Sequence, residues 1–326
     1  MESFYLLLIV ILLAVIFDFI NGFHDSANAI ATVISTRVMT PRIAILMAAL
    51  MNLIGAFAGT AVAKTVGSGL VEAEAVTQIT IIAALVAAII WDLITWYFGI
   101  PSSSSHALLA GLVGAGVAKG GTQVLIWSGL NKILLALLLS PLLGFMIGWI
   151  VMVGLFWVFQ YSTPSRVTGV SQKLQILSAS YMAFSHGSND SQKSMGIITA
   201  ALVSFYSLKD FHVPVWVIML CAVAMGVGTA FGGWRIIRTL GLKLTALRPI
   251  NGFAAEMSAA SVIEIASHIG VPISTTHTIS ASIMGVGATR RLSAVKWGVG
   301  INIIFAWILT LPACATMAWL ICRVLK

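Results

Sequence analysis

Long apolar segments constrain this chain more than any other feature of its sequence. A bilayer core of about 30 Å is crossed by roughly 20 apolar residues in a helix. Eight segments approach or exceed that length: 4–23, 43–63, 77–99, 133–160, 174–205, 214–233, 250–270 and 297–322. Charged residues make up 9% of the sequence, whereas a soluble domain contains about 25%. We therefore expect an all-α integral membrane protein embedded in the lipid bilayer, without a separate soluble domain.

The net charge of +8 comes from basic residues that cluster in the short loops between these segments. In a soluble protein such a charge would indicate a nucleic-acid partner, but in membrane proteins basic loops mark the cytoplasmic side. We expect no nucleic-acid partner. The three cysteines lie in apolar segments without metal-ligand spacing, and we expect no cofactor.

Two polar motifs occur twice in the sequence, in the same order. The acidic motif is found at 22–25 and 187–190, and a proline, a hydroxyl run and a histidine follow at 101–106 and 272–277. The aspartate precedes the histidine by 81 residues in the first copy and by 87 in the second. This agreement predicts an internal duplication. The predicted units are a first transmembrane repeat (1–160), a short connector (161–173) and a second transmembrane repeat (174–326).

The placement of the basic loops predicts that the two repeats are inverted. Basic residues precede the span 43–63 in the first repeat but follow the matching span 214–233 in the second. If basic loops share one side of the membrane, matching spans cross it in opposite directions, as in inverted-repeat transporters. This topology needs an odd number of crossings between the motifs, so we expect 124–160 to be broken at Ser140-Pro141.

The acidic motifs lie at membrane depth, where a carboxylate costs about 2.5–3.5 kcal/mol even on a lenient scale. They either cap helices and bond between them, or line a cavity for protons or cations, whose preferred ligands are carboxylate and amide oxygens. The duplication favours the cavity. We expect Lys193, which corresponds to Asn28, to act as a tethered cation beside Asp190. The expected coupling-ion residues are Asp25, Asn28, Asn189, Asp190 and Lys193, with His24 as a secondary candidate.

The hydroxyl runs lie in two short, glycine-containing apolar segments, about 100–118 and 271–288. Each proline favours a chain break followed by a helix start, and a helix N-terminus binds anions through its unpaired N–H groups. Since non-helical backbone at membrane depth must be buried or line a cavity, we expect two re-entrant helical hairpins that enclose an oxyanion; simple helix capping is the alternative. The expected anion ligands are Ser103, Ser104, Ser105, Ser274, Thr275 and Thr276, and His106 and His277 are secondary candidates that either donate to the anion or are structural.

Anion donors and carboxylates in one cavity predict coupled transport. Ionised acids would repel a phosphate unless cations or protons neutralise them, so the anion and the cation would travel together. The hairpins alone also allow a carrier for another tetrahedral oxyanion, such as sulfate. A further alternative is an intramembrane serine hydrolase that uses Ser105, His106 and Asp25, but it gives the second copies of the motifs no task.

The motifs GFHDSANAIAT, SHGSNDSQK, PSSSSH and PISTTH resemble the paired signatures of the inorganic phosphate transporter (PiT) family, over almost the whole chain. The resemblance implies an inverted-repeat secondary carrier, not an enzyme, that imports inorganic phosphate with protons or sodium. In bacterial members it implies uptake partly as a neutral divalent metal–phosphate complex. By motif, Asp25, Asn28 and Asp190 would bind the coupling ion, and they would be metal ligands if that ion is sodium. The hairpin hydroxyls would hold phosphate.

Two positions depart from the pattern of many sodium-coupled relatives. Those relatives have a glutamate where Asn52 stands and an asparagine where Lys193 stands, whereas Glu256 matches their second glutamate. The departures resemble the bacterial, low-affinity, proton-coupled branch, so we expect protons rather than sodium and a bacterial plasma (inner) membrane. The oligomeric state stays open, with a homodimer among the alternatives.

Overall fold

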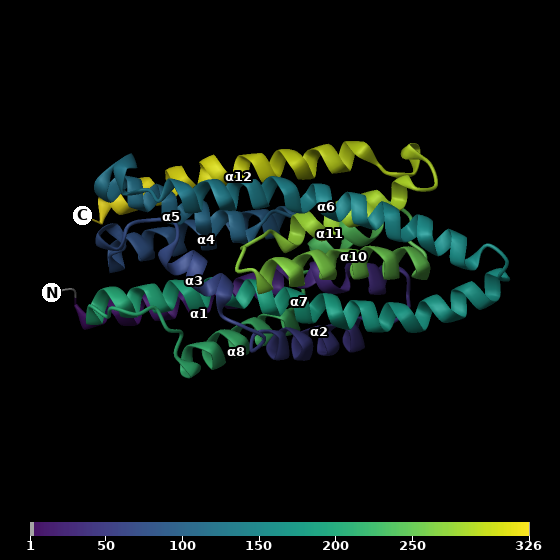
Figure 1. The fold of residues 1–326 in the computed structure, drawn as a ribbon, viewed down its shortest axis with the longest axis horizontal. Helices are drawn as coiled ribbons and strands as arrows, with labels where there is room; N and C mark the ends of the chain where they lie inside the picture. The colour runs from purple at the N-terminus through teal and green to yellow at the C-terminus, as the bar shows by residue number, and fades with distance from the viewer. Residues whose placement is uncertain (1–2, 326) are drawn as a thin grey trace.

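The computed structural model describes residues 3–325, and this part of the chain consists of α-helices joined by short turns, with no β-sheet. The helices form one elongated bundle (Figure 1). Both ends of the chain lie at one end of this bundle, and the turn that follows α6 lies at the other (Figure 1). The prediction of an all-α protein is confirmed.

The two halves of the chain contain elements in the same order. The first half comprises α1 (Phe4–Ser35), α2 (Pro41–Gly55), α3 (Ala61–Ser68), η1 (Ala73–Ala75), α4 (Gln78–Phe98), α5 (Ser104–Gly120), η2 (Thr122–Val124) and α6 (Trp127–Phe159). The second comprises α7 (Pro164–Tyr206), α8 (Val215–Phe231), α9 (Trp234–Arg238), η3 (Thr239–Lys243), α10 (Pro249–His268), α11 (Thr275–Ala288), η4 (Leu292–Ala294) and α12 (Trp297–Val324). In each half a long helix carrying the acidic motif comes first, and a shorter helix carrying the hydroxyl run comes before the last long helix.

Glycine and proline end one helix and start the next at equivalent places in the two halves. Gly99, after α4, and Gly270, after α10, have φ angles of 67° and 69°, a left-handed conformation that glycine adopts without steric cost. Pro101 and Pro272 follow two residues later, and the helices α5 and α11 begin within three residues of them. The hydroxyl runs therefore lie at the N-termini of α5 and α11, as the sequence predicts.

Packing between the halves follows the same equivalence. α1 packs against α8 and α7 against α2, while α5 packs against α12 and α11 against α6. Within each half, α4 packs on α5 and α10 packs on α11. Each hydroxyl-tipped helix is thus held by one helix of its own half and one of the other, which fixes the two tips relative to each other.

The structure differs from the expected spans in three places. α6 runs unbroken through Pro141, so the predicted break at Ser140-Pro141 is wrong; membrane helices tolerate an internal proline where neighbouring helices and side chains satisfy the freed groups. The expected span 43–63 is divided between α2 and α3. The expected connector 161–173 is helical from Pro164 onward, because that proline starts α7.

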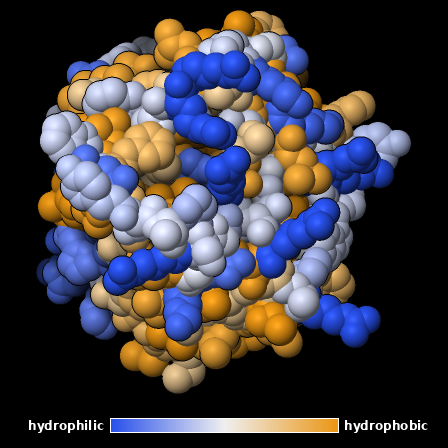
Figure 2. Space-filling model, turned by 90° about the vertical axis from the view of Figure 1, so that its right-hand side faces the viewer, coloured by the Kyte–Doolittle hydropathy of each residue, from blue (hydrophilic) through white to orange (hydrophobic). Residues whose placement is uncertain are grey.

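Among the described residues, four helices are long and apolar enough to cross a membrane: α1, α4, α6 and α12. The bent pair formed by α8 and the segment Trp234–Lys243 would make a fifth. Large apolar side chains such as Leu138 and Ile308 are exposed on the outside of the bundle. Figure 2 looks onto the end with the α6–α7 turn, where hydrophilic residues cover the middle of the face and hydrophobic ones surround it. This surface is that of an integral membrane protein.

Candidate functional site

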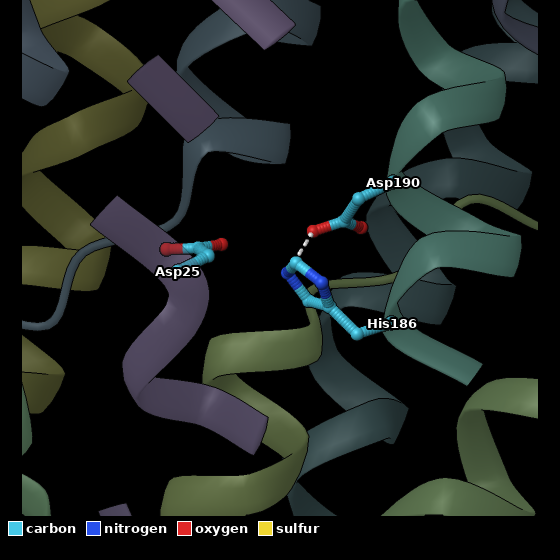
Figure 3. Close-up of side chains that lie close together, drawn as sticks. All are labelled: Asp25, His186 and Asp190. Carbon is cyan, nitrogen blue, oxygen red and sulfur yellow. Dashed lines mark ion pairs between the residues drawn. The ribbon is translucent and has the colours of Figure 1, made fainter. Parts of the chain in front are cut away.

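The two acidic motifs meet in the centre of the bundle. Asp25 on α1 is 2% exposed and Asp190 on α7 is fully buried. One ligand atom from each of Asp25, His186 and Asp190 lies within 4.8 Å of the others, and in Figure 3 the Asp25 carboxylate faces the His186 ring and Asp190 from the opposite side. Two carboxylates 165 positions apart in the sequence are thus neighbours in space.

Asp190 is surrounded by donors. The Lys193 ammonium donates to Asp190 Oδ1, to the Ser105 hydroxyl and, over 3.1 Å, to the Ile273 carbonyl. His186 Nε2 lies 3.1 Å from Asp190 Oδ2, and the Thr275 hydroxyl donates to the same oxygen over 3.0 Å. Lys193 is itself 1% exposed, so its charge has no access to water and is balanced by Asp190.

Asp25 has a different set of partners. Its Oδ1 lies 2.6 Å from His24 Nδ1, and its Oδ2 accepts a bond from the Thr276 hydroxyl over 3.3 Å. His24 Nε2 lies 3.1 Å from the Thr95 hydroxyl of α4, which also accepts a bond from Ser102. No lysine or arginine side chain of the described residues forms an ion pair with Asp25.

The tips of the two hydroxyl-bearing segments lie against each other. Ser105 Oγ donates to the Ile273 carbonyl over 3.4 Å, while Ser103 and Ser274 accept bonds from the backbone N–H groups of His106 and His277. Ser103 and Ser274 are therefore N-caps of α5 and α11, as the helix-capping alternative predicts for these two residues. Ser104, Ser105, Thr275 and Thr276 are buried at the same tips with side chains that do not cap these helices in that way.

The asparagines of the motifs bond to hydroxyl groups on neighbouring helices. Asn28 Nδ2 donates to the Thr276 hydroxyl over 2.9 Å and to Thr275 over 3.4 Å, and Asn189 Nδ2 donates to Ser267 over 2.8 Å. The amide oxygens of both asparagines are buried without a hydrogen-bond partner among the described residues. Each offers a free acceptor of the kind that binds a cation.

Asn52 and Glu256 form hydrogen bonds with other residues of the described chain and not with Asp25 or Asp190. Asn52 Oδ1 accepts from His186 Nδ1 over 2.9 Å, and its Nδ2 donates to Thr229. Asn52 therefore orients the imidazole that faces Asp190. Glu256 of α10 is fully buried and accepts hydrogen bonds from three side chains of α1 and α7: Thr32, Gln175 and Ser178.

His106 and His277 contact each other and an aromatic ring, and neither is hydrogen-bonded to Asp25 or Asp190 among the described residues. Their rings pack edge-to-face with centroids 4.3 Å apart, and His277 stacks on Trp307 at 3.8 Å. Both line an apolar pocket of about 600 Å³ between α6 and α12. Neither ring nitrogen of His106 has a hydrogen-bond partner among the described residues, so the geometry gives Ser105 no base and does not assemble the hydrolase triad.

Three buried residues of the site were not singled out from the sequence. His186 stands one helical turn before Asp190, a spacing at which helix side chains meet, and this spacing could have identified it. Asp18 and Asp92 are fully buried carboxyl groups in the apolar helices α1 and α4. Their signal was an acid within an apolar span, which is by itself a functional hint.

Comparisons with known proteins identify the family. A model described as "Phosphate transporter family" matches residues 21–167 and 159–318. A "Probable low-affinity inorganic phosphate transporter" of Rhizobium meliloti is 48% identical over 97% of this chain and 95% of its own length. A protein of the same description from Bacillus subtilis is 45% identical over 96% of this chain and 95% of its own length. A solved structure described as "The sodium-dependent phosphate transporter" superimposes with a TM-score of 0.92 at 27% identity, covering 99% of both chains. The chain is thus a transporter and not an enzyme, and it belongs to the phosphate transporter family.

Proposed function

We propose that this protein imports inorganic phosphate across a bacterial plasma membrane by proton symport, through two inverted halves that share one central site. The observation that carries the proposal is one buried cluster in which Thr275 and Thr276 of α11 bond to Asp190 and Asp25, and Ser105 of α5 bonds to Lys193, the partner of Asp190. Inversion is supported by the directions of equivalent helices: from its N-terminus, α1 runs left to right in Figure 1, whereas α7 runs right to left.

Phosphate would bind at the N-termini of α5 and α11. The first N–H groups of a helix lack intrahelical partners and carry partial positive charge, and two such ends converge here. Ser104, Ser105, Thr275 and Thr276 add buried hydroxyl donors at the same place. A dianion or monoanion held there would replace some of the bonds that Thr275 and Thr276 now make to Asp190 and Asp25.

Neutralisation of the acids makes binding of the anion depend on a co-transported cation. The buried carboxyl groups of the described residues are Asp18, Asp25, Asp92, Asp190 and Glu256, and Lys193 is the buried amine. Two unit charges 4 Å apart repel by about 4 kcal/mol at an effective dielectric constant of about 20. A phosphate can enter this cluster only after acids beside it have taken up protons or another cation.

Lys193 favours protons over sodium as that cation. Its ammonium contacts a carboxylate oxygen, a hydroxyl oxygen and a backbone carbonyl oxygen, which is the ligand set that a sodium ion would need. A fixed positive charge at this position would repel a sodium ion. Asp25, which has no such fixed partner, would be the group that exchanges a proton during each cycle.

A divalent metal ion carried together with phosphate is a second candidate for the cargo. Asp25, His186 and Asp190 offer two carboxylates and an imidazole within 4.8 Å of one another, and imidazole and carboxylate are ligands of divalent metals such as manganese and zinc. A neutral metal–phosphate complex would bind with its metal on these residues and its phosphate at the two helix ends.

Uptake of labelled phosphate into proteoliposomes tests the proposal. A pH gradient, acidic outside, should drive accumulation, while a sodium gradient at equal pH should not, and arsenate but not sulfate in excess should block uptake. Accumulation driven by sodium alone, or block by sulfate, would contradict it. Adding Mn²⁺ or a chelator tests the second cargo: metal-stimulated uptake that is lost in His186→Gln would support the complex.

A further inference from the structure

Asp92, near the C-terminal end of α4, belongs to neither of the repeated motifs. Its side chain is fully buried, neither Oδ1 nor Oδ2 has a partner in normal hydrogen-bond geometry, and the Ser104 hydroxyl is the side-chain donor that acts on it. In the described part of the chain it is the one carboxyl group with both oxygens buried and unpaired; in Asp18, by comparison, Oδ1 accepts a bond from Ser194 over 2.6 Å. An ionised carboxylate with so few donors is expensive to bury, so the charge of Asp92 must be offset during the transport cycle.

The side chains that act on Asp92 come from helices packed on α4; α9 also packs on α4, but its Arg235 is engaged by the carbonyl and ring of Tyr97. The strongest electrostatic effects on it come from His24 and Asp25 of α1, Ser104 of α5 and Asp190 of α7, and Asp92 acts in turn on Cys314 of α12. These neighbours include two acids but no lysine or arginine. His24 is already engaged by Asp25 and Thr95, so it provides no dedicated counter-ion for Asp92.

Asp92 is also linked to the proposed phosphate site through the first turn of α5. Ser104 is the first residue of that helix, its buried hydroxyl acts on the Asp92 carboxyl, and α4 packs along α5. The helix end that would hold phosphate therefore has Asp92 beside it. A phosphate at this end and a negative charge on Asp92 would repel each other in a site from which water is excluded.

We infer that Asp92 is a proton-binding site of the transport cycle, loaded together with phosphate and unloaded with it. In the loaded state the Asp92 carboxylate has taken one proton from the outside solution to become a neutral carboxylic acid. After phosphate leaves to the inside, the acid releases that proton to the inside and regains its negative charge. This inference rests on the proposed proton symport and adds one proton to each cycle beyond any that Asp25 carries.

A purely structural role would make Asp92 a permanently neutral acid. Two substitutions distinguish the roles because they change shape and proton binding in opposite ways. Asp92→Asn keeps the size of the side chain and removes the proton site, whereas Asp92→Glu keeps the proton site and adds one methylene to a packed interior. Asp210→Asn, which removes an exposed carboxylate between α7 and α8, is the control for loss of a charge.

The measurement is the phosphate accumulation ratio at zero net flux, in proteoliposomes that contain the purified full-length chain. The membrane potential is clamped to zero and the pH difference is one unit. Each co-transported proton multiplies this ratio by about ten per pH unit. We expect Asp92→Asn to reach a ratio about tenfold below the parent, and Asp92→Glu and Asp210→Asn to reach the parental ratio at whatever rate they transport.

The outcomes separate this inference from the proposed function. A parent protein whose accumulation ignores the pH gradient would overturn the proton symport itself. A pH-driven parent together with an Asp92→Asn variant that reaches the same ratio would overturn only the role of Asp92. Loss of the tenfold factor in both Asp92→Asn and Asp92→Glu would assign Asp92 to packing and would also overturn it.

Discussion

Replacing Lys193 by asparagine should make the site respond to sodium, if it is proton-coupled as proposed. Lys193→Asn removes a buried ammonium and leaves Asp190, which retains His186 Nε2 at 3.1 Å and the Thr275 hydroxyl at 3.0 Å. The space left by the ammonium is lined by oxygens of Asp190, Ser105 and Ile273. A sodium ion is bound by oxygens of this kind, and the new asparagine would supply one more.

The magnitude follows from breaking a buried ion pair. Removing one partner of such a pair typically costs about 3–5 kcal/mol, and the Thr275 hydroxyl that still donates to Asp190 places this case near the lower end, about 3 kcal/mol. A sodium ion bound with a Kd of about 1 mM would raise the free energy of unfolding of the variant by about 2.7 kcal/mol at roughly 100 mM sodium. Sodium should therefore restore most of the lost stability, raising Tm by on the order of 5 °C.

The assay compares thermal unfolding in detergent with NaCl and with choline chloride at equal ionic strength, and then uptake driven by a sodium gradient. Lys173→Asn, which removes an exposed lysine from the same helix, is the matched control. The parent and Lys173→Asn should show no preference for sodium, while Lys193→Asn should show one in both measurements. The reasoning is refuted if Lys193→Asn unfolds and transports with the same ion dependence as the parent.

Two further substitutions address the acid and the helix ends. Asp25→Asn should insert and fold but lose phosphate accumulation against a gradient, because the group that exchanges the proton is gone; near-normal accumulation in proteoliposomes would count against this role. Ser103→Ala combined with Ser274→Ala should lower the free energy of unfolding by about 2 kcal/mol, since each loses an N-cap worth about 1 kcal/mol. It should also raise the KM for phosphate, and an unchanged KM and Tm would remove the two helix ends from the site.

The sequence was sufficient to predict that the hydroxyl runs start helices and that the acids lie at membrane depth. Local rules decide both: a proline followed by hydroxyl residues favours a helix N-terminus, and an acid within an apolar segment is buried wherever that segment packs. The pairing of Thr275 with Asp190 and of Thr276 with Asp25 required the relative position of two helices. No local rule gives that position.

Other features depended on neighbours that the sequence does not reveal. Pro141 would break an isolated helix, but α6 is packed against α11, and its Gly144 faces the backbone of α11 at Thr278. Asp92 is an isolated acid in the sequence, and only the packing of α5 and α1 on α4 brings the Ser104 and His24 side chains close to it. Packing between distant helices therefore decides which buried polar residues form the site.

The equivalent residues Asn28 and Lys193 each donate hydrogen bonds to the hydroxyl run of the other half, but Asn28 is a neutral amide and Lys193 carries a positive charge. Asn28 of the first half donates to Thr275 and Thr276 of the second hydroxyl run, and Lys193 of the second half donates to Ser105 of the first. The neutral amide places no fixed charge beside Asp25, whereas the ammonium places a fixed positive charge against Asp190. If both positions were asparagine, both acids would need a mobile cation. In the proposed symport, the one lysine takes the place of one coupling cation, so fewer coupling ions accompany each phosphate.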